Sequence, residues 1–175
     1  MAGIVSAVAS LLTPDARPFT NFNFLVEIDV DGVSDMVCAA IFSDVDGLEM
    51  TIEPKTIKEG GRNTGPVHMA GQVGYGQLTL KRGMTSNFDL WTWFEVVASP
   101  GQGGLRGSAD ITVLDGQGNE QVQYSLTGVL PVKLKAPALN AKDGLIAIEE
   151  MTLLYESLTL NAPGFNLVGA LASLL

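Results

Sequence analysis

Charge is scarce in this chain, and positive charge is scarcer still. Only 17% of the 175 residues are charged, with 10 Lys and Arg against 19 Asp and Glu, so the net charge is −9. Binding to nucleic acid needs clustered Lys and Arg that neutralise phosphates, so a direct nucleic-acid partner is not expected. Hydrophobic residues make up 46% and the mean hydropathy is +0.26. So little charge leaves apolar surface to be covered, which favours self-association over a free monomer.

Cysteine and histidine are nearly absent. Cys38 is the only cysteine, so an internal disulfide is excluded, and His68 is the only histidine, with no other ligand at metal-binding spacing. The segment Asp-Val-Asp-Gly occurs at 29–32 and 44–47, but neither copy completes a calcium-loop ligand set, and both indicate turns. No Gly-x-Ser-x-Gly, Walker or zinc pattern occurs. We therefore expect no catalytic, metal or cofactor site.

Long apolar runs are also missing, so no segment predicts a membrane span. The apolar start of the chain has no basic flank, which argues against a secretory signal and favours synthesis in the cytoplasm. We expect residues 1–18 and 161–175 to be apolar extensions that flank a domain at 19–160. Each extension could pack on its own core or on a neighbouring subunit, and membrane insertion is the remaining, weakest alternative.

Alternating apolar and polar residues predict β-strands along most of the chain. Strands are expected at 22–30, 36–42, 48–57, 77–82, 109–114, 121–134 and 145–160, with turns at 31–32, 44–47 and 115–119. Residues 59–76 are rich in glycine and predict a long, exposed, adaptable loop. In the strand over 121–134, Val122, Tyr124 and Leu126 mark the apolar phase, and Val129 and Pro131 fall in the polar phase. Pro131 also predicts an edge or a bulge. A bulge or bend is expected at Glu149-Glu150, where the apolar phase slips.

One helix is predicted after Gly83, because Leu90, Trp93, Phe94 and Val97 form a single apolar stripe. Ser86 is the expected N-cap, and Ser99-Pro100-Gly101 ends the helix. The change from strand to helix predicts a structural joint at Arg82, Gly83, Trp91 and Trp93. The chain is thus expected to be mainly β, an antiparallel barrel or sandwich of about seven strands with one packed α-helix.

An ordered set of segments resembles the tail-tube proteins of contractile phages and related injection systems. It comprises Phe24-Leu25-Val26-Glu27-Ile28, residues 42–49, Glu59-Gly60-Gly61, residues 80–83, residues 90–94, residues 136–141 and residues 146–153. The resemblance covers roughly residues 19–160. It departs from that family at Met69-Ala70-Gly71, where relatives often have Leu-Pro-Gly.

The resemblance implies a hexameric ring of subunits that pair strands edge to edge around a lumen. Rings stack into a tube inside a contractile sheath, so the implied partners are the chain itself, sheath protein, baseplate and spike proteins, and cargo in the lumen. It implies a particle assembled in the bacterial cytoplasm. From it we expect residues 57–71 to bridge subunits, with Arg62 meeting a neighbour's carboxylate. The candidate contact residues are Ile57, Glu59, Gly60, Gly61, Arg62, Gly65 and Gly71.

Other functions stay open at this stage. A baseplate ring that initiates the tube, or the secreted ring protein of the type VI apparatus, would share this architecture. A monomeric β-barrel with an apolar ligand inside belongs to a different class. A hydrolase is the weakest alternative, because it needs a polar constellation that the sequence does not offer.

Overall fold

The computed structural model describes residues 23–31, 42–58, 65–101, 105–139, 142, 144 and 146–162. Nine strands and one helix lie in this part of the chain, so the mainly β prediction is confirmed, with more strands than the expected seven. Their bounds are, in order, β1 Phe24–Val30, β2 Asp44–Asp46, β3 Met50–Ile57, β4 Val67–Tyr75, β5 Gln77–Gly83, α2 Asp89–Ala98, β6 Gly107–Leu114, β7 Glu120–Lys135, β8 Ile148–Leu154 and β9 Ser157–Asn161.

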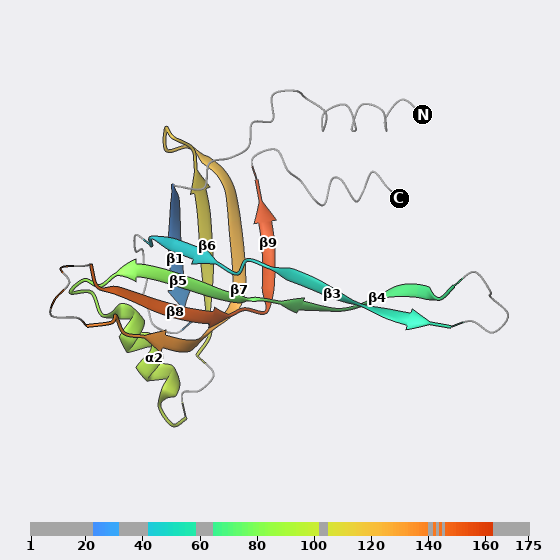
Figure 1. The fold of residues 1–175 in the computed structure, drawn as a ribbon, viewed down its shortest axis with the longest axis horizontal. Helices are drawn as coiled ribbons and strands as arrows, with labels where there is room; N and C mark the ends of the chain where they lie inside the picture. The colour runs from blue at the N-terminus through green and yellow to red at the C-terminus, as the bar shows by residue number, and fades with distance from the viewer. Residues whose placement is uncertain are drawn as a thin grey trace.

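Seven of the strands form one antiparallel sheet that folds over on itself, in the order β1-β6-β7-β8-β5-β2, with β9 also paired to β7. The long strand β7 belongs to both layers, because its first part pairs with β6 and β9 and its last part pairs with β8. Its direction changes at Gly128, whose φ of +65° is a conformation that favours glycine. We call β1-β6-β7-β9 the first layer and β2-β5-β8-β7 the second layer. The strands of the two layers run crosswise (Figure 1).

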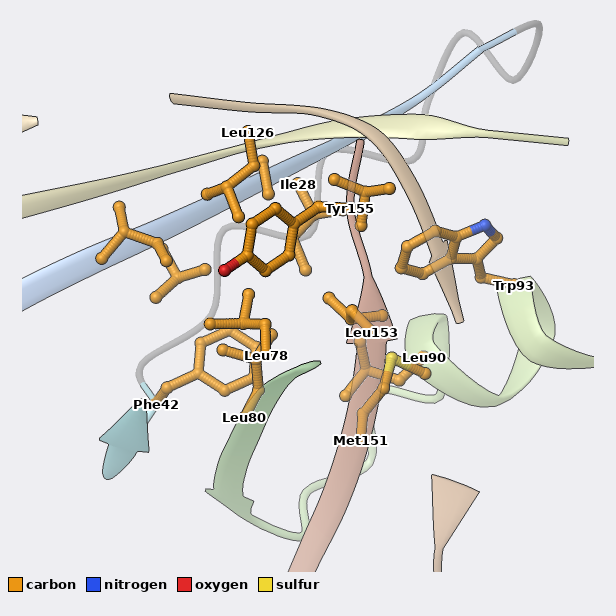
Figure 2. Close-up of a cluster of buried hydrophobic side chains, with 14 of the residues drawn as sticks. Ile28, Phe42, Leu78, Leu80, Leu90, Trp93, Leu126, Met151, Leu153 and Tyr155 are labelled. Carbon is orange, nitrogen blue, oxygen red and sulfur yellow. The ribbon is translucent and has the colours of Figure 1, made fainter. Parts of the chain in front are cut away.

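The core lies between the two layers (Figure 2). Ile28 and Leu126 come from the first layer, Leu78 and Leu153 come from the second, and the Tyr155 ring lies between them. Each of these residues is at most 5% exposed. The apolar phases predicted for β1 and β5 are therefore confirmed, because they place the same face of each strand against this core.

Helix α2 closes one end of the space between the layers (Figure 1). Leu90 and Trp93 are its buried residues, as the apolar stripe predicted. The predicted cap is wrong, since the N-cap is Phe88 and the side-chain acceptor nearby is Asn87, whose Oδ1 accepts the Asp89 amide at 3.0 Å. The helix ends at Ala98, where Ser99 takes an extended conformation, so the predicted stop is confirmed. Among the described residues, no helix is long and apolar enough to cross a membrane.

Three local predictions need correction. Asp44–Asp46 form strand β2 on the edge beside β5, and only Gly47, with a φ of +98°, makes the turn. Much of the glycine-rich segment is strand β4 rather than loop, because it pairs with β3. Glu149-Glu150 continue the regular β5–β8 register, and the break in the last segment falls between β8 and β9 instead. The strand expected at 36–42 lies outside the described residues except for Phe42, which is buried.

The apolar phase of β7 changes partway along the strand. Val122 and Leu126 are buried as expected, but beyond Gly128 the buried residues are Val129 and Pro131, which the sequence placed in the polar phase. The register shifts once beside Gly128 and once more at Pro131, where a bulge was predicted. Each shift moves the next side chains to the other face of the strand. Strand β7 therefore contributes core residues both where it belongs to the first layer and where it belongs to the second.

Candidate assembly surfaces

Strands β3 and β4 form a separate two-stranded hairpin that projects away from the two layers (Figure 1). We call this hairpin the arm. All eight residues of β3 are exposed, yet the arm carries five large apolar side chains that are between 43% and 57% exposed: Met50, Ile52, Ile57, Met69 and Val73. An isolated two-stranded hairpin is marginally stable in water, and exposed apolar side chains in one place indicate a surface that another molecule covers.

A bulge divides the arm into two halves. The register moves from Ile52–Val73 to Pro54–Ala70, so β4 places two residues opposite Glu53. Gly71 is one of the two, and a Cβ there would lie 2.0 Å from the Glu53 carbonyl oxygen, so only glycine fits. Because the extra residue shifts the alternation, Met50, Ile52 and Val73 share one face near the body, and Ile57, Val67 and Met69 share the opposite face beyond the bulge.

The base of the arm is fastened to the core by Tyr155, which lies in the break between β8 and β9. Its hydroxyl is 2.9 Å from the Gly47 and Glu49 carbonyl oxygens and accepts the Glu49 amide at 2.9 Å. The Tyr155 ring packs at an angle on Tyr75, with centroids 5.6 Å apart. A tyrosine that is 5% exposed therefore satisfies its polar atom at the point where the arm leaves the body.

The structure describes three of the seven predicted contact residues. Ile57 lies at the outer end of β3 and is 45% exposed, Gly65 precedes β4 with open space around its Cα, and Gly71 forms the bulge. Glu59, Gly60, Gly61 and Arg62 lie outside the described residues. The prediction named residues 57–71 and did not include the apolar residues nearer the body. Their signal was the alternation of Met50 and Ile52 in the strand predicted at 48–57.

Two of the four predicted joint residues, Arg82 and Trp91, meet around the buried carboxylate of Glu149. Arg82 Nε donates to Glu149 Oε1, and Trp91 Nε1 donates to Glu149 Oε2 at 3.0 Å. A second Arg82 nitrogen donates to the Asn87 carbonyl oxygen at 3.0 Å, which holds the turn before α2. Arg82 and Glu149 are 3% and 1% exposed, so this pair links β5, β8 and the helix within the protein interior. Nothing in this geometry presents a reactive group to a substrate.

The outward face of the first layer is polar. The register brings its side chains into rows across β1, β6, β7 and β9, and the face consists of Leu25, Glu27, Asp29, Ser108, Asp110, Thr112, Gln123, Ser125, Thr127, Ser157, Thr159 and Asn161. Hydrogen bonds cross it, with Ser125 Oγ donating to Asp110 at 2.6 Å and Asn161 donating to Ser125 at 3.2 Å. Among these described residues the three charges are all negative. We call this surface the polar face.

The outward face of the second layer carries charges of both signs. Lys81 donates to Asp44 at 2.6 Å, and Glu150 lies 3.5 Å from Lys133 and 3.8 Å from Lys135. The hydrogen bond from Lys81 to Asp44 raises the pKa of that ammonium. Acidic and basic groups therefore pair on this surface, whereas the polar face has carboxylates without basic partners on the same face.

The first layer ends in two strands with a free edge. In the described part of the chain, β1 pairs only with β6 and β9 pairs only with β7. Because neighbours alternate in direction across β1-β6-β7-β9, the two edge strands run in opposite directions. An exposed strand edge is a template for pairing with another chain, and here the β9 edge of one copy suits the β1 edge of the next in an antiparallel ladder.

Residues 20–159 match the family described as T4-like virus tail tube protein gp19. The chain belongs to this family. The match spans most of the sequence and agrees with the resemblance drawn from its segments. A search of curated proteins found no match.

Solved structures show the same tail-tube fold. A chain of the anti-feeding prophage baseplate, symmetrised six-fold, has a TM-score of 0.75 and 24% identity, with 84% of this chain and 97% of that chain covered. A chain of the sheath-tube complex of the PVC extracellular contractile injection system has a TM-score of 0.72 and 20% identity, with 85% and 95% covered. Hcp1 from Flavobacterium johnsoniae reaches only 0.50, at 14% identity, with 79% and 96% covered.

Proposed function

We propose that this tail-tube family member is the structural subunit of the inner tube in a contractile injection system or phage tail. Its copies form rings, and the rings stack into a conduit that delivers cargo and serves as the puncturing shaft. The observation that carries the proposal is the pair of free, oppositely directed edges of the first layer. The baseplate chain with the highest TM-score above comes from an assembly with six-fold symmetry, which supports a hexameric ring here.

Ring closure would place the polar face around the lumen. The second layer, α2 and the arm lie on the side of the first layer away from the polar face, or beyond its edge (Figure 1). Only the outside of a closed barrel has room for them, so the polar face points inward. Four strands per copy keep every neighbouring pair antiparallel, including the pairs between copies. The first layer then has no free edge, which removes the aggregation hazard of an open sheet.

The remaining expectations of this function concern partners and place. We propose that the tube lies within a sheath and joins baseplate and spike proteins, and that the subunit is made and assembled in the bacterial cytoplasm before it becomes part of a particle. The similar PVC chain belongs to a sheath-tube complex, which supports the sheath as a partner. We propose a structural role without catalysis, since the buried Arg82–Glu149 pair links structural elements.

Negative-stain microscopy of the purified protein tests the proposal, with rings or tubes as the expected result. Light scattering that shows a single compact species of 18.4 kDa at high protein concentration would contradict it. Rings that never stack would instead support the two related alternatives, a baseplate initiator ring or a type VI-like secreted ring. The lower TM-score with Hcp1 favours the tube subunit over the second of these.

A monomeric ligand-binding barrel is the remaining alternative, and the interior gives it no support. Core side chains fill the space between the layers (Figure 2). The described part has hollows of about 170 and 190 Å³, one beside Glu120 and Asn161 and the other beside Glu27 and Asp110. Both are smaller than the roughly 300–1,000 Å³ of usual ligand pockets.

The arm supplies a second test. We propose that residues 57–71 bridge subunits, so deleting residues 60–70 should leave a folded subunit that makes no tubes. Circular dichroism and thermal unfolding report the fold, and microscopy reports the tubes. Tubes of normal length from the deleted chain would remove the arm from the assembly mechanism.

A further inference from the structure

A second apolar surface lies at the opposite end of the molecule from the arm. It consists of Met84, Ile146 and Ile148, which are between 42% and 81% exposed, and we call it the end patch. The edge pair Gly83–Ile148 closes the β5–β8 ladder there, and the Met84 amide donates to the Ala147 carbonyl oxygen at 2.8 Å. Ile146 lies against Gly83, 3.6 Å from the position of a Cβ. These contacts hold the apolar residues at the end of the second layer.

The half of the arm nearest the body has an apolar face that continues the protein's own core. Met50 is paired with Tyr75, so the two side chains share a face, and Tyr75 packs on the core residue Tyr155. One pair further out, Ile52 and Val73 extend that face past the end of the two layers, where they are 56% and 43% exposed. We call Met50, Ile52 and Val73 the arm strip. The base of this face is covered by the core, and its outer part exposes apolar side chains that a second apolar surface can cover.

The arm and the end patch lie on opposite sides of the body, as do the two free strand edges. In Figure 1 the arm extends to the right, beyond β9, while the β5–β8 end that carries the end patch lies to the left, beyond β1. A second copy on the right therefore presents its β1 edge to β9 and its end patch to the arm strip. A single head-to-tail arrangement of copies therefore brings together both the two strand edges and the two apolar surfaces.

We propose that the arm strip of each copy docks on the end patch of the next copy, with Ile52 and Val73 covered by Ile146 and Ile148. The occupant of the patch is thus a second copy of this chain. The two surfaces differ, so the contact is heterologous: each copy gives its arm to one neighbour and receives an arm from the other. Such contacts close into rings when the rotation permits. This inference rests on the proposed tube function and identifies the receptor for the arm.

A thiol crosslink between copies tests the docking. In a Cys38→Ser background, Val73→Cys combined with Ile148→Cys places one thiol on the arm strip and one on the end patch. A short bifunctional maleimide is expected to convert most of the assembled chain into covalent dimers and higher ladders. The control pair is Val73→Cys with Gln117→Cys, since Gln117 lies in the loop between β6 and β7, and it should stay largely monomeric on a denaturing gel. Tubes without a ladder from the test pair would overturn the docking and leave the tube function intact.

A charge in either surface provides an independent measurement. Ile148→Glu and Ile52→Glu are both expected to abolish rings and tubes in microscopy, because each places a carboxylate in an apolar contact. Both residues are exposed in the single chain, so thermal unfolding of the dilute subunits should stay close to that of the parent chain. Normal tubes from both variants would overturn the docking. Failure of the parent chain to form rings would instead remove the proposed function on which it rests.

Discussion

The body and the arm use the same kind of strand but give their apolar side chains opposite surroundings. In β1, Val26, Ile28 and Val30 alternate with polar residues and are at most 4% exposed. In β3, Met50 and Ile52 alternate with Thr51 and Glu53 in the same way, yet they are more than half exposed. Burial of each such side chain contributes about 1.5–3 kcal/mol. The body gains that free energy by folding, whereas the arm can gain it only from another molecule.

The strongest test of this contrast lies in the body. Glu149→Ala leaves Arg82 charged and buried without its carboxylate, and we expect it to lower the free energy of unfolding by about 3–5 kcal/mol. Glu150→Ala is the matched control, because Glu150 pairs with lysines on the exposed face and its loss should cost less than about 1 kcal/mol. Denaturant unfolding of dilute subunits measures both. Similar small changes for the two variants would show that the buried pair does not stabilise the body.

A smaller effect is expected where the arm joins the body. Tyr155→Phe removes the hydroxyl that meets Gly47 and Glu49, so the Glu49 amide loses its partner, and we expect a cost of about 1–3 kcal/mol. Tyr124→Phe is the control on a half-buried ring. Hydrogen exchange should show faster exchange at the base of β3 in the first variant. An unchanged exchange rate there would mean that the hydroxyl does not fasten the arm.

The arm itself should be nearly insensitive in the single chain. Ile52→Ser alters a side chain that is more than half exposed, so the unfolding free energy of dilute subunits should change by less than about 0.5 kcal/mol. Ile28→Ser, at a residue that is 1% exposed, should cost about 2–5 kcal/mol. Equal losses of unfolding free energy for the two substitutions would contradict the idea that the body buries its own apolar side chains and the arm does not.

The loop at 115–119 is exposed like the arm, but its polar groups form hydrogen bonds within the loop. A substitution there should have the smallest effect on stability. Asp115 accepts hydrogen bonds from Asn119, Gln117 and Gly118, and the bond from the Asn119 side chain is the main cause of its lowered pKa. The stability that comes with a lowered pKa is present above the ordinary value of 3.8 and is lost as the pH falls through the folded value. The Asp115→Ala penalty in the unfolding midpoint should thus be present at neutral pH and shrink as the pH falls below 3.8. A penalty that is independent of pH would exclude the charge as its source.

Much of the body could be predicted from local pattern. Alternation located β1, β5 and β6, and the 3.6-residue stripe located α2, because each buries one face against a single core. The alternation pattern gave the wrong face where the backbone shifts register. Gly128 exchanges the two faces of β7, so Val129 and Pro131 are core residues although they fall in the polar phase of the sequence. No local signal in the sequence tells which face such a shift will select.

The assembly surfaces were predictable only in part. The glycine-rich segment and Ile57 were predicted to contact other copies, and this stays a prediction. The glycine content also suggested a loop, whereas the ladder with β3 makes residues 67–75 a strand. The end patch was not predicted, since Met84 lies far in the sequence from Ile146 and Ile148. Pairing of β5 with β8 brings them to one end, and that pairing is a property of the tertiary structure.

Strand β7 has a mechanical consequence for whatever load the protein carries. One continuous run of backbone, Glu120–Lys135, passes from the first layer into the second. Sliding one layer over the other would therefore disrupt the β6 and β9 ladders on one side of Gly128 and the β8 ladder on the other. A shear force applied to the outer surface reaches the inner surface through covalent bonds. The two layers should thus yield together, as one wall.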